Sequence, residues 1–342
     1  MKAFAPVNIA WVKYMGKELN QNGARPTNSS FSMTLSEYGT ETQIIRLQPS
    51  GSLEFEFCEQ GYLPPPNGQA KAFRFLQDFT PFMHLLQKWG FRSIAPSGRY
   101  RIETRNSVPA GTGIATSASG FAALTLAWIP YLMSAQEFST FRSLFASDSG
   151  LRGDLARVSA RGSGSACRSF HGPFVEWRSD GEVIPFSDVA GGWIDLILML
   201  EEGPKSVSSS EAHTRVRSSP LFSGRADRAH ERLLRVKEAL ALGRWDWISS
   251  SVLEEALDMH ELFHTSVPPF RYFNRESEAW RDRVLSGKGL PSRHAALTFD
   301  AGANAHLFVP EAESEIWVSW LRSEFPGLVF LRGSAGKGAE YR

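Results

Sequence analysis

A glycine- and serine-rich segment at residues 109–120, PAGTGIATSASG, limits most strongly how this 342-residue chain can fold. It follows a strand-like stretch at 99–104 and leads into an apolar, helix-like stretch at about 117–133. Glycines let backbone amides approach a ligand closely, and the first N–H groups of a helix attract an anion. The segment therefore predicts a phosphate loop between a strand and a helix. A glycine-rich turn with serine caps fits the spacing equally well, because neither G-x-x-x-x-G-K-[ST] nor G-x-G-x-x-G is present.

Charge and cysteine content exclude several classes of protein. The chain has 37 basic and 36 acidic residues, so its near-zero net charge of +1 gives no general attraction to nucleic acid or to anionic membranes. Its 2 cysteines and scattered histidines lack the spacing of a zinc site or a metal hydrolase. The longest apolar stretch, 120–133, is interrupted by Pro130 and is too short to span a membrane. We expect a cytoplasmic protein that binds neither nucleic acid nor membranes.

The order of strand-like and helix-like segments predicts an α+β fold. Alternating or β-branched residues predict strands in the first hundred residues at 31–35, 42–47 and 53–57. Helical spacing follows at 70–89 and at 225–264, where a break is expected near Gly243. Two more strands are predicted at 295–298 and 306–309, on either side of the sequence FDAGAN. The boundary between two halves is expected within 181–192, and the tail GSAGKGAEYR is expected to be a flexible terminus.

A second cluster of small and hydroxyl residues lies at 161–172, RGSGSACRSFHG. Ser163, Ser165 and the amides around them are candidates for a phosphate pocket. Arg168 can offer a planar fork to a carboxylate or phosphate. Tight packing at a helix start is the alternative interpretation.

Two charged residues lie where chemistry is possible. Lys13 lies among apolar residues of VNIAWVKY, so it either faces solvent on a strand or is retained for chemistry. Asp300 lies between an expected strand and a glycine turn, where it can point into a cleft or cap a turn. The serines at 206–210, followed by Glu211, fit a helix cap or a further anion contact.

Taken together, these motifs resemble those of the diphosphomevalonate decarboxylases, a family within the GHMP kinase superfamily. The resemblance runs the length of the chain through these segments: APVNIAWVKYMGK, RPTNSSFSMTLSE, NSVPAGTGIATSASGFAAL, RGSGSACRSFHGPFVEW, SVSSSEAHTR and LTFDAGANAHL. It implies a two-lobed GHMP kinase fold around one cleft. The expected lobes are an N-terminal ATP-binding α/β lobe at 1–187 and a C-terminal, ferredoxin-like α+β lobe at 188–342.

The resemblance also implies a reaction. The family uses ATP and Mg²⁺ to convert (R)-5-diphosphomevalonate into isopentenyl diphosphate, releasing ADP, phosphate and CO₂ in isoprenoid biosynthesis. A homodimer is expected on the same ground. Two alternatives stay open: a decarboxylase acting on the 5-monophosphate, and a mevalonate-type kinase that does not decarboxylate. A catalytically silent nucleotide-binding protein is a third possibility, but we expect such a protein to have lost one of the residues Lys13, Arg168 and Asp300.

Residue roles follow from the resemblance, motif by motif. Asp300, Lys13 and Arg168 match the catalytic aspartate, its neighbouring lysine and the arginine that holds the substrate carboxylate. The expected substrate contacts are Tyr14, Met15, Gly16, Lys17, Ser163, Gly164, Ser165, Ala166, Cys167 and Ser210. The expected ATP contacts are Pro109, Ala110, Gly111, Thr112, Gly113, Ser117 and Ser119. The sequence does not identify the Mg²⁺ ligands.

This chain departs from the common pattern at a few of these positions. Met15 replaces the usual tryptophan, and Thr112, Ile114 and Thr116 replace other loop residues. None of these changes removes a proposed catalytic group. Ser210 occupies a position where some bacterial relatives carry arginine, so the phosphorylation state of the substrate is less constrained than the type of reaction.

Overall fold

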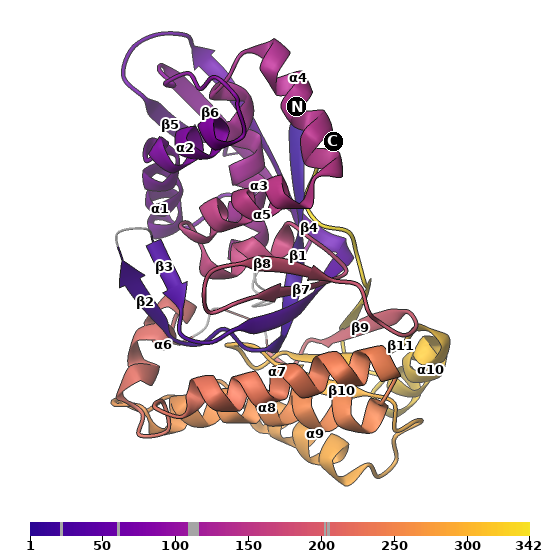
Figure 1. Ribbon diagram of the computed structural model, residues 1–342. Coiled ribbons are helices and arrows are strands. Elements are labelled where there is room, and N and C mark those ends of the chain that lie inside the picture. Colours follow the sequence, from indigo (N-terminus) through magenta and orange to yellow (C-terminus); the bar gives the residue numbers. More distant parts are fainter. Residues whose placement is uncertain (21–22, 60–61, 109–115, 202, 204–205) are drawn as a thin grey trace.

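The computed structural model (Figure 1) describes residues 1–20, 23–59, 62–108, 116–201, 203 and 206–342. Its strands are β1 (Lys2–Val12), β2 (Lys17–Asn20), β3 (Gly23–Pro26), β4 (Ser30–Gln48), β5 (Glu54–Phe57), β6 (Arg99–Asn106), β7 (Phe174–Trp177), β8 (Val183–Phe186), β9 (Trp193–Leu198), β10 (Ala296–Phe299), β11 (Ala305–Pro310), β12 (Phe330–Ser334) and β13 (Glu340–Tyr341). Its α-helices are α1 (Pro66–Gln77), α2 (Thr80–Lys88), α3 (Thr116–Trp128), α4 (Ala135–Ser147), α5 (Ser149–Ala160), α6 (Ser209–Arg215), α7 (Arg225–Leu242), α8 (Trp245–Thr265), α9 (Arg275–Ser286) and α10 (Ser314–Glu324). Short 3₁₀ helices include η2 (Gly164–Ser169). This mixture confirms the predicted α+β class.

The first sheet has the strand order β13-β1-β4-β6-β5, with β7 pairing to β4 and β8 pairing to β7. Helix α3 packs against β1 and β4. The two strands predicted at 31–35 and 42–47 are one continuous strand, β4. Gly39 lies in its middle because a Cβ there would be 2.3 Å from the carbonyl oxygen of Ala5 on the neighbouring strand.

The second sheet has the order β10-β11-β9-β12 and lies between two layers. Because side chains alternate along a strand, Ile197 and Leu196 of β9 face opposite ways. Ile197 belongs to a core shared with Trp11 of β1 and with α7 and α8. Leu196 belongs to a second core with Trp317 of α10 and with α9. The end of β1 therefore lies where the first lobe meets the second sheet and its helices (Figure 1).

Proline and glycine residues determine where several helices begin and end. The single helix expected at 70–89 is two helices, α1 and α2, because Pro81 belongs to the first turn of α2 and cannot sit inside a continuous helix. The break predicted near Gly243 is confirmed, since this glycine ends α7 with a φ of 65°.

The C-terminal tail is ordered, so the prediction of a flexible terminus was wrong. Residues 340–341 form β13, which pairs with β1, and the termini lie side by side (Figure 1). The N–H of Ala339 donates to the Ser169 carbonyl at 2.8 Å, and that of Gly336 to the Thr34 carbonyl at 2.8 Å. Its glycines serve close packing: a Cβ at Gly338 would lie 2.1 Å from the Phe170 oxygen. No helix within the described ranges is both long and apolar enough to cross a membrane.

Candidate active site

Lys13 is the first residue after β1, and its side chain is buried between the lobes. Its Nζ donates to Oδ1 of Asp300 at 2.7 Å and to the carbonyl of Ala10 at 2.6 Å. Burial lowers the pKa of Lys13, and the adjacent Asp300 carboxylate opposes that shift. The sequence allowed Lys13 either to face solvent on a strand or to be a charge retained for chemistry. Its burial excludes the solvent-facing position.

Asp300 comes directly after β10, at the first position of the turn that leads to β11. Its side chain is 26% exposed while that of Lys13 is 2% exposed, so one end of the pair is accessible and the other is not. Nε2 of His260 in α8 donates to the Asp300 carbonyl at 3.1 Å and helps to fix the turn. Two segments 287 residues apart thus form one ion pair.

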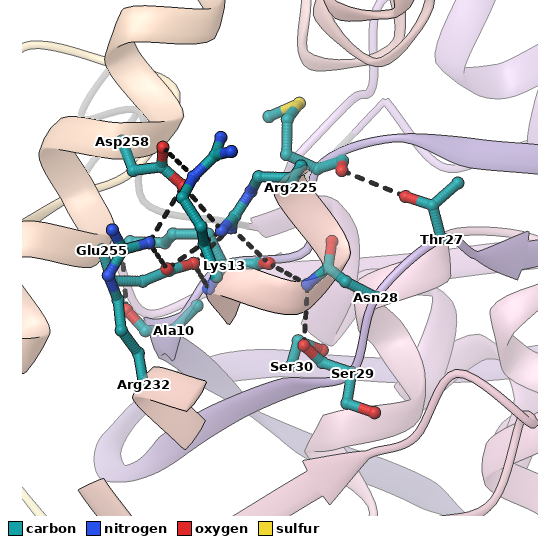
Figure 2. Close-up of polar contacts among 12 residues, drawn as sticks. Ala10, Lys13, Thr27, Asn28, Ser29, Ser30, Arg225, Arg232, Glu255 and Asp258 are labelled. Carbon is teal, nitrogen blue, oxygen red and sulfur yellow. Dashed lines mark hydrogen bonds and ion pairs between the residues drawn. The ribbon is translucent and has the colours of Figure 1, made fainter. Parts of the chain in front are cut away.

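A buried charge network supports the backbone of Lys13 (Figure 2). The Lys13 N–H donates to Oε1 of Glu255 at 2.9 Å. Glu255 is fully buried in α8 and also binds Arg225 of α7, in part through a 3.0 Å contact from Nη1. Arg232 donates to Glu255 at 3.0 Å and to Asp258 at 2.9 Å. Sequence reasoning missed this network, because charged residues on a helix usually lie on a solvated face.

The Lys13 carbonyl is held as firmly as its N–H. It accepts hydrogen bonds from Nδ2 of Asn28 at 2.9 Å and from Nη2 of Arg225 at 3.3 Å (Figure 2). Both backbone groups of Lys13 therefore have fixed partners, and these contacts limit the positions that its ammonium can reach.

Arg168 lies in η2 and is buried against β1 and β4. Its Nε donates to Oδ1 of Asn8 at 3.2 Å and to Oγ of Ser32 at 3.1 Å, and Nη1 donates to Oγ of Ser30 at 2.8 Å. Burial lowers the pKa of Arg168, with Asp300 among the groups that oppose the shift. Among the described residues, no carboxylate pairs with this guanidinium and no partner contacts Nη2. A pre-oriented cation with a spare donor can bind a ligand carboxylate.

The turn after β1 contacts the second small-residue cluster through Tyr14. A Cβ on Gly164 would lie 2.6 Å from Cε1 of Tyr14, so only glycine lets this backbone lie on the ring. The Tyr14 ring also contacts Trp177 at a centroid distance of 4.8 Å and His213 of α6 at 4.4 Å. Gly16 adopts a φ of 94°, which favours glycine.

The other residues of the second cluster take different positions. Ser163 is partly exposed and lies 3.5 Å from the hydroxyl of Ser117. The carbonyl of Ser165 accepts a hydrogen bond from Nδ2 of Asn8 at 3.1 Å. Ala166 and Cys167 are buried, and burial raises the pKa of Cys167 to about 12, so this thiol stays protonated and inert.

Three further substrate-side positions differ in exposure. Met15 is buried in a core with Val207, while Lys17 at the start of β2 is partly exposed. Ser210 is exposed in the first turn of α6. The cap predicted for the serines at 206–210 is Ser208, which accepts a hydrogen bond from the N–H of Glu211 at 3.2 Å.

The predicted ATP loop is described only in part. The expected contacts Pro109, Ala110, Gly111, Thr112 and Gly113 lie outside the described residues. Ser117 is partly exposed at the start of α3. Ser119 is buried, and its hydroxyl pairs with that of Thr40 at 2.7 Å, so it faces the sheet.

A pocket of about 230 Å³ opens beside Ser117. Its walls come from β4, β6, the first turn of α1 and the start of α3, and include Thr104, Asn106, Pro65 and Phe121. Apolar walls with a few polar groups suit a flat heteroaromatic ligand such as a nucleobase. In the described part of the chain, His, Cys, Asp and Glu residues do not gather in threes to hold a metal ion.

Family models match most of the chain. The model of the diphosphomevalonate decarboxylase-like N-terminal domain matches residues 5–184, and that of the mevalonate 5-diphosphate decarboxylase C-terminal domain matches residues 195–335. The chain belongs to the diphosphomevalonate decarboxylase family. Similar members include the enzymes of Aspergillus fumigatus, 31% identical over 91% of this chain and 77% of the relative, and Ganoderma lucidum, 29% identical over 95% and 82%.

Solved structures of the family share the fold. A complex of MDDEF with MVAPP, AMPPCP and magnesium superposes with a TM-score of 0.79 at 28% identity, covering 99% of this chain and 97% of that one. The mevalonate diphosphate decarboxylase of Legionella pneumophila gives 0.76 at 27% identity, covering 96% and 99%. These matches confirm the predicted two-lobed fold of the decarboxylase family and its GHMP kinase relatives.

Proposed function

We propose that this chain converts (R)-5-diphosphomevalonate and ATP into isopentenyl diphosphate, ADP, phosphate and CO₂. The observation that carries the proposal is the 2.7 Å pair between the buried Lys13 ammonium and the accessible Asp300 carboxylate. Arg168 lies near enough to Asp300 for their charges to interact. Family membership supports the same reaction, because the matched relatives carry the name diphosphomevalonate decarboxylase.

Asp300 is proposed to act on the tertiary 3-hydroxyl of the substrate. The carboxylate accepts the hydroxyl proton while the oxygen attacks the γ-phosphorus of ATP and the bond to ADP breaks. Lys13 keeps Asp300 ionised and oriented, because an adjacent cation favours the charged carboxylate. This step turns a poor leaving group, hydroxide, into a good one, phosphate.

Arg168 is proposed to direct the second step. The bond between C3 and the phosphorylated oxygen breaks, and phosphate leaves with the electron pair. Electrons of the bond to the carboxylate then form the new double bond, and CO₂ departs. Arg168 holds the carboxylate so that the breaking bond is aligned, and such positioning can supply much of the rate. A kinase that stopped after the first step would have little use for this contact.

Ser117 and the pocket beside it are proposed to receive ATP. We expect Mg²⁺ to arrive with ATP, because proteins usually hold this ion through substrate phosphates, waters and one or two carboxylates. When bound, the ion neutralises charge on the phosphates. Further ATP contacts from the predicted loop at 109–113 are proposed from the sequence alone.

The test supplies the chain with ATP, Mg²⁺ and one of three substrates: mevalonate, its 5-phosphate or its 5-diphosphate. ADP and CO₂ are followed separately. We expect the highest kcat/KM with the 5-diphosphate. Higher kcat/KM with the 5-phosphate would move the assignment to a monophosphate decarboxylase, which the neutral, exposed Ser210 favours. ADP release without CO₂ would leave only a kinase.

We also propose that the lobes divide at 187/188, between β8 of the first sheet and β9 of the second. Strand β13 then returns to the first sheet at the end of the chain. A homodimer is proposed on the resemblance alone. Light scattering tests it against the chain mass of 38.0 kDa.

A further inference from the structure

His213 of α6 lies where three of the segments expected to hold the substrate meet. Its ring is 4.4 Å from that of Tyr14, centroid to centroid, and Tyr14 in turn lies against the backbone of Gly164. The N–H of Gly16 donates to Nδ1 of His213 at 3.1 Å. The side chain therefore connects α6 to the turn after β1, beside the GSGSAC segment at 162–167. None of the sequence motifs predicts a role for this histidine.

The hydrogen bond from Gly16 fixes the tautomer of His213. Because Nδ1 accepts a hydrogen bond, it carries no proton, and the N–H of the neutral ring is on Nε2. Burial, together with the nearby cations Lys17, Arg168 and Lys71, lowers the pKa of His213 to about 3. The ring is thus a neutral donor at physiological pH.

The positive charges near His213 favour the binding of an anion. Among the described residues, the charges that lower its pKa are those of three cations: Lys17 of β2, Arg168 of η2 and Lys71 of α1. Within the described ranges, no protein group accepts the hydrogen bond that Nε2 can donate. Nε2 lies across the ring from Nδ1, so this N–H points away from Gly16. A donor set among cations matches the oxygens of a phosphate group.

We propose that His213 is a specificity-determining residue whose Nε2–H donates a hydrogen bond to a phosphate oxygen of the phosphorylated mevalonate. This inference rests on the proposed function and adds to it a residue of this chain. A neutral N–H donor orients the phosphate group without adding positive charge. A fourth cation at this position would be repelled by the three that are already there. The ligand class is an organic phosphate or diphosphate.

Two substitutions separate the ligand contact from the contact with Gly16. His213→Asn keeps an acceptor near the position of Nδ1 and removes the donor at Nε2. His213→Gln reaches the position of Nε2 with an N–H and gives up the acceptor near Gly16. Steady-state kinetics of both variants, with the melting temperature as a check on folding, give KM for the phosphorylated substrate and for ATP.

We expect His213→Asn to raise KM for the phosphorylated substrate about 10- to 100-fold, as loss of a hydrogen bond to a charged group does, and to leave KM for ATP unchanged. His213→Gln should remain within about threefold of wild type, because a neutral donor is retained. An unchanged KM in the asparagine variant, or equal losses in both variants, would overturn the proposal.

Calorimetric binding of inorganic pyrophosphate to the same three proteins tests His213 independently of turnover. Weaker binding only in His213→Asn supports the contact even if the assigned reaction proves wrong. Equal binding by all three proteins refutes the contact even if the reaction is right.

Discussion

Replacing Glu255 by glutamine should unfold the protein far more easily than the same change at the neighbouring Glu254. Glu255 is fully buried and forms ion pairs with Arg225 and Arg232, whose side chains are 1% and 15% exposed. Glutamine keeps the shape and an oxygen for the Lys13 N–H, so the change removes mainly one negative charge. The arginines then depend on Asp258 alone among the carboxylates of this network.

The magnitude follows from burial. Removing one partner of a buried ion pair leaves an uncompensated charge and costs about 3–5 kcal/mol. Glu254 is 52% exposed, and its nearest cation, Arg235, is 3.5 Å away. An exposed pair of this kind contributes about 0–1 kcal/mol. Both residues lie in the same helix, so Glu254→Gln is a matched control for helix propensity.

Urea denaturation, followed by tryptophan fluorescence, measures both free energies of unfolding. We expect a loss of about 3–5 kcal/mol for Glu255→Gln and at most about 1 kcal/mol for Glu254→Gln. Equal losses would refute the view that the network under Lys13 carries buried, interdependent charges. The candidate active site gives a second readout. Glu255 opposes the lowering of the Lys13 pKa by burial, so in the glutamine variant Lys13 should lose its proton, and the protein its activity, at a lower alkaline pH than in wild type.

Further predictions concern the proposed catalytic groups and acid stability. Asp300→Asn should lower kcat by at least about 100-fold with little change in ATP affinity by calorimetry, and an unchanged kcat would remove Asp300 from the mechanism. Arg168→Lys should lower kcat/KM about 10- to 100-fold, because an ammonium cannot reproduce the fixed fork; wild-type kinetics would show that the carboxylate is held elsewhere. His171, His213 and His260 have pKa values lowered by burial from 6.5 to about 4, about 3 and about 3. The unfolded chain binds these protons first, so stability should fall as pH drops below about 6.5, by up to about 4 kcal/mol per pH unit for three protons. Stability that is flat from pH 7 to 4.5 in urea titrations would contradict this assignment.

The sequence predicted the charged groups that lie next to recognisable motifs. Lys13 and Asp300 each follow a strand with an apolar pattern, and the structure pairs them. Arg168 was expected to bind a ligand, and its buried, hydroxyl-lined setting is compatible with that role. Local sequence patterns can predict such residues, because a few neighbouring residues are enough to mark the end of a strand or a glycine turn.

The rest depends on tertiary packing. Glu255 contacts Lys13 from 242 residues away, and no local spacing marks that contact. His213 gains its partners only when α6 packs beside Tyr14. The prediction of a flexible tail was wrong because glycines are common in flexible segments. In the structure, Gly336 and Gly338 instead permit close contact with β4 and with the residues after η2.

The most direct test of the proposed reaction is a single turnover with 5-diphosphomevalonate labelled in its carboxyl carbon. Enzyme in excess over substrate is mixed with ATP and Mg²⁺, and ADP and labelled CO₂ are counted over time. The arrangement of Lys13, Asp300 and Arg168 predicts one CO₂ for each ADP. ADP formed while the label stays in a non-volatile product would contradict the assignment of Arg168 to decarboxylation.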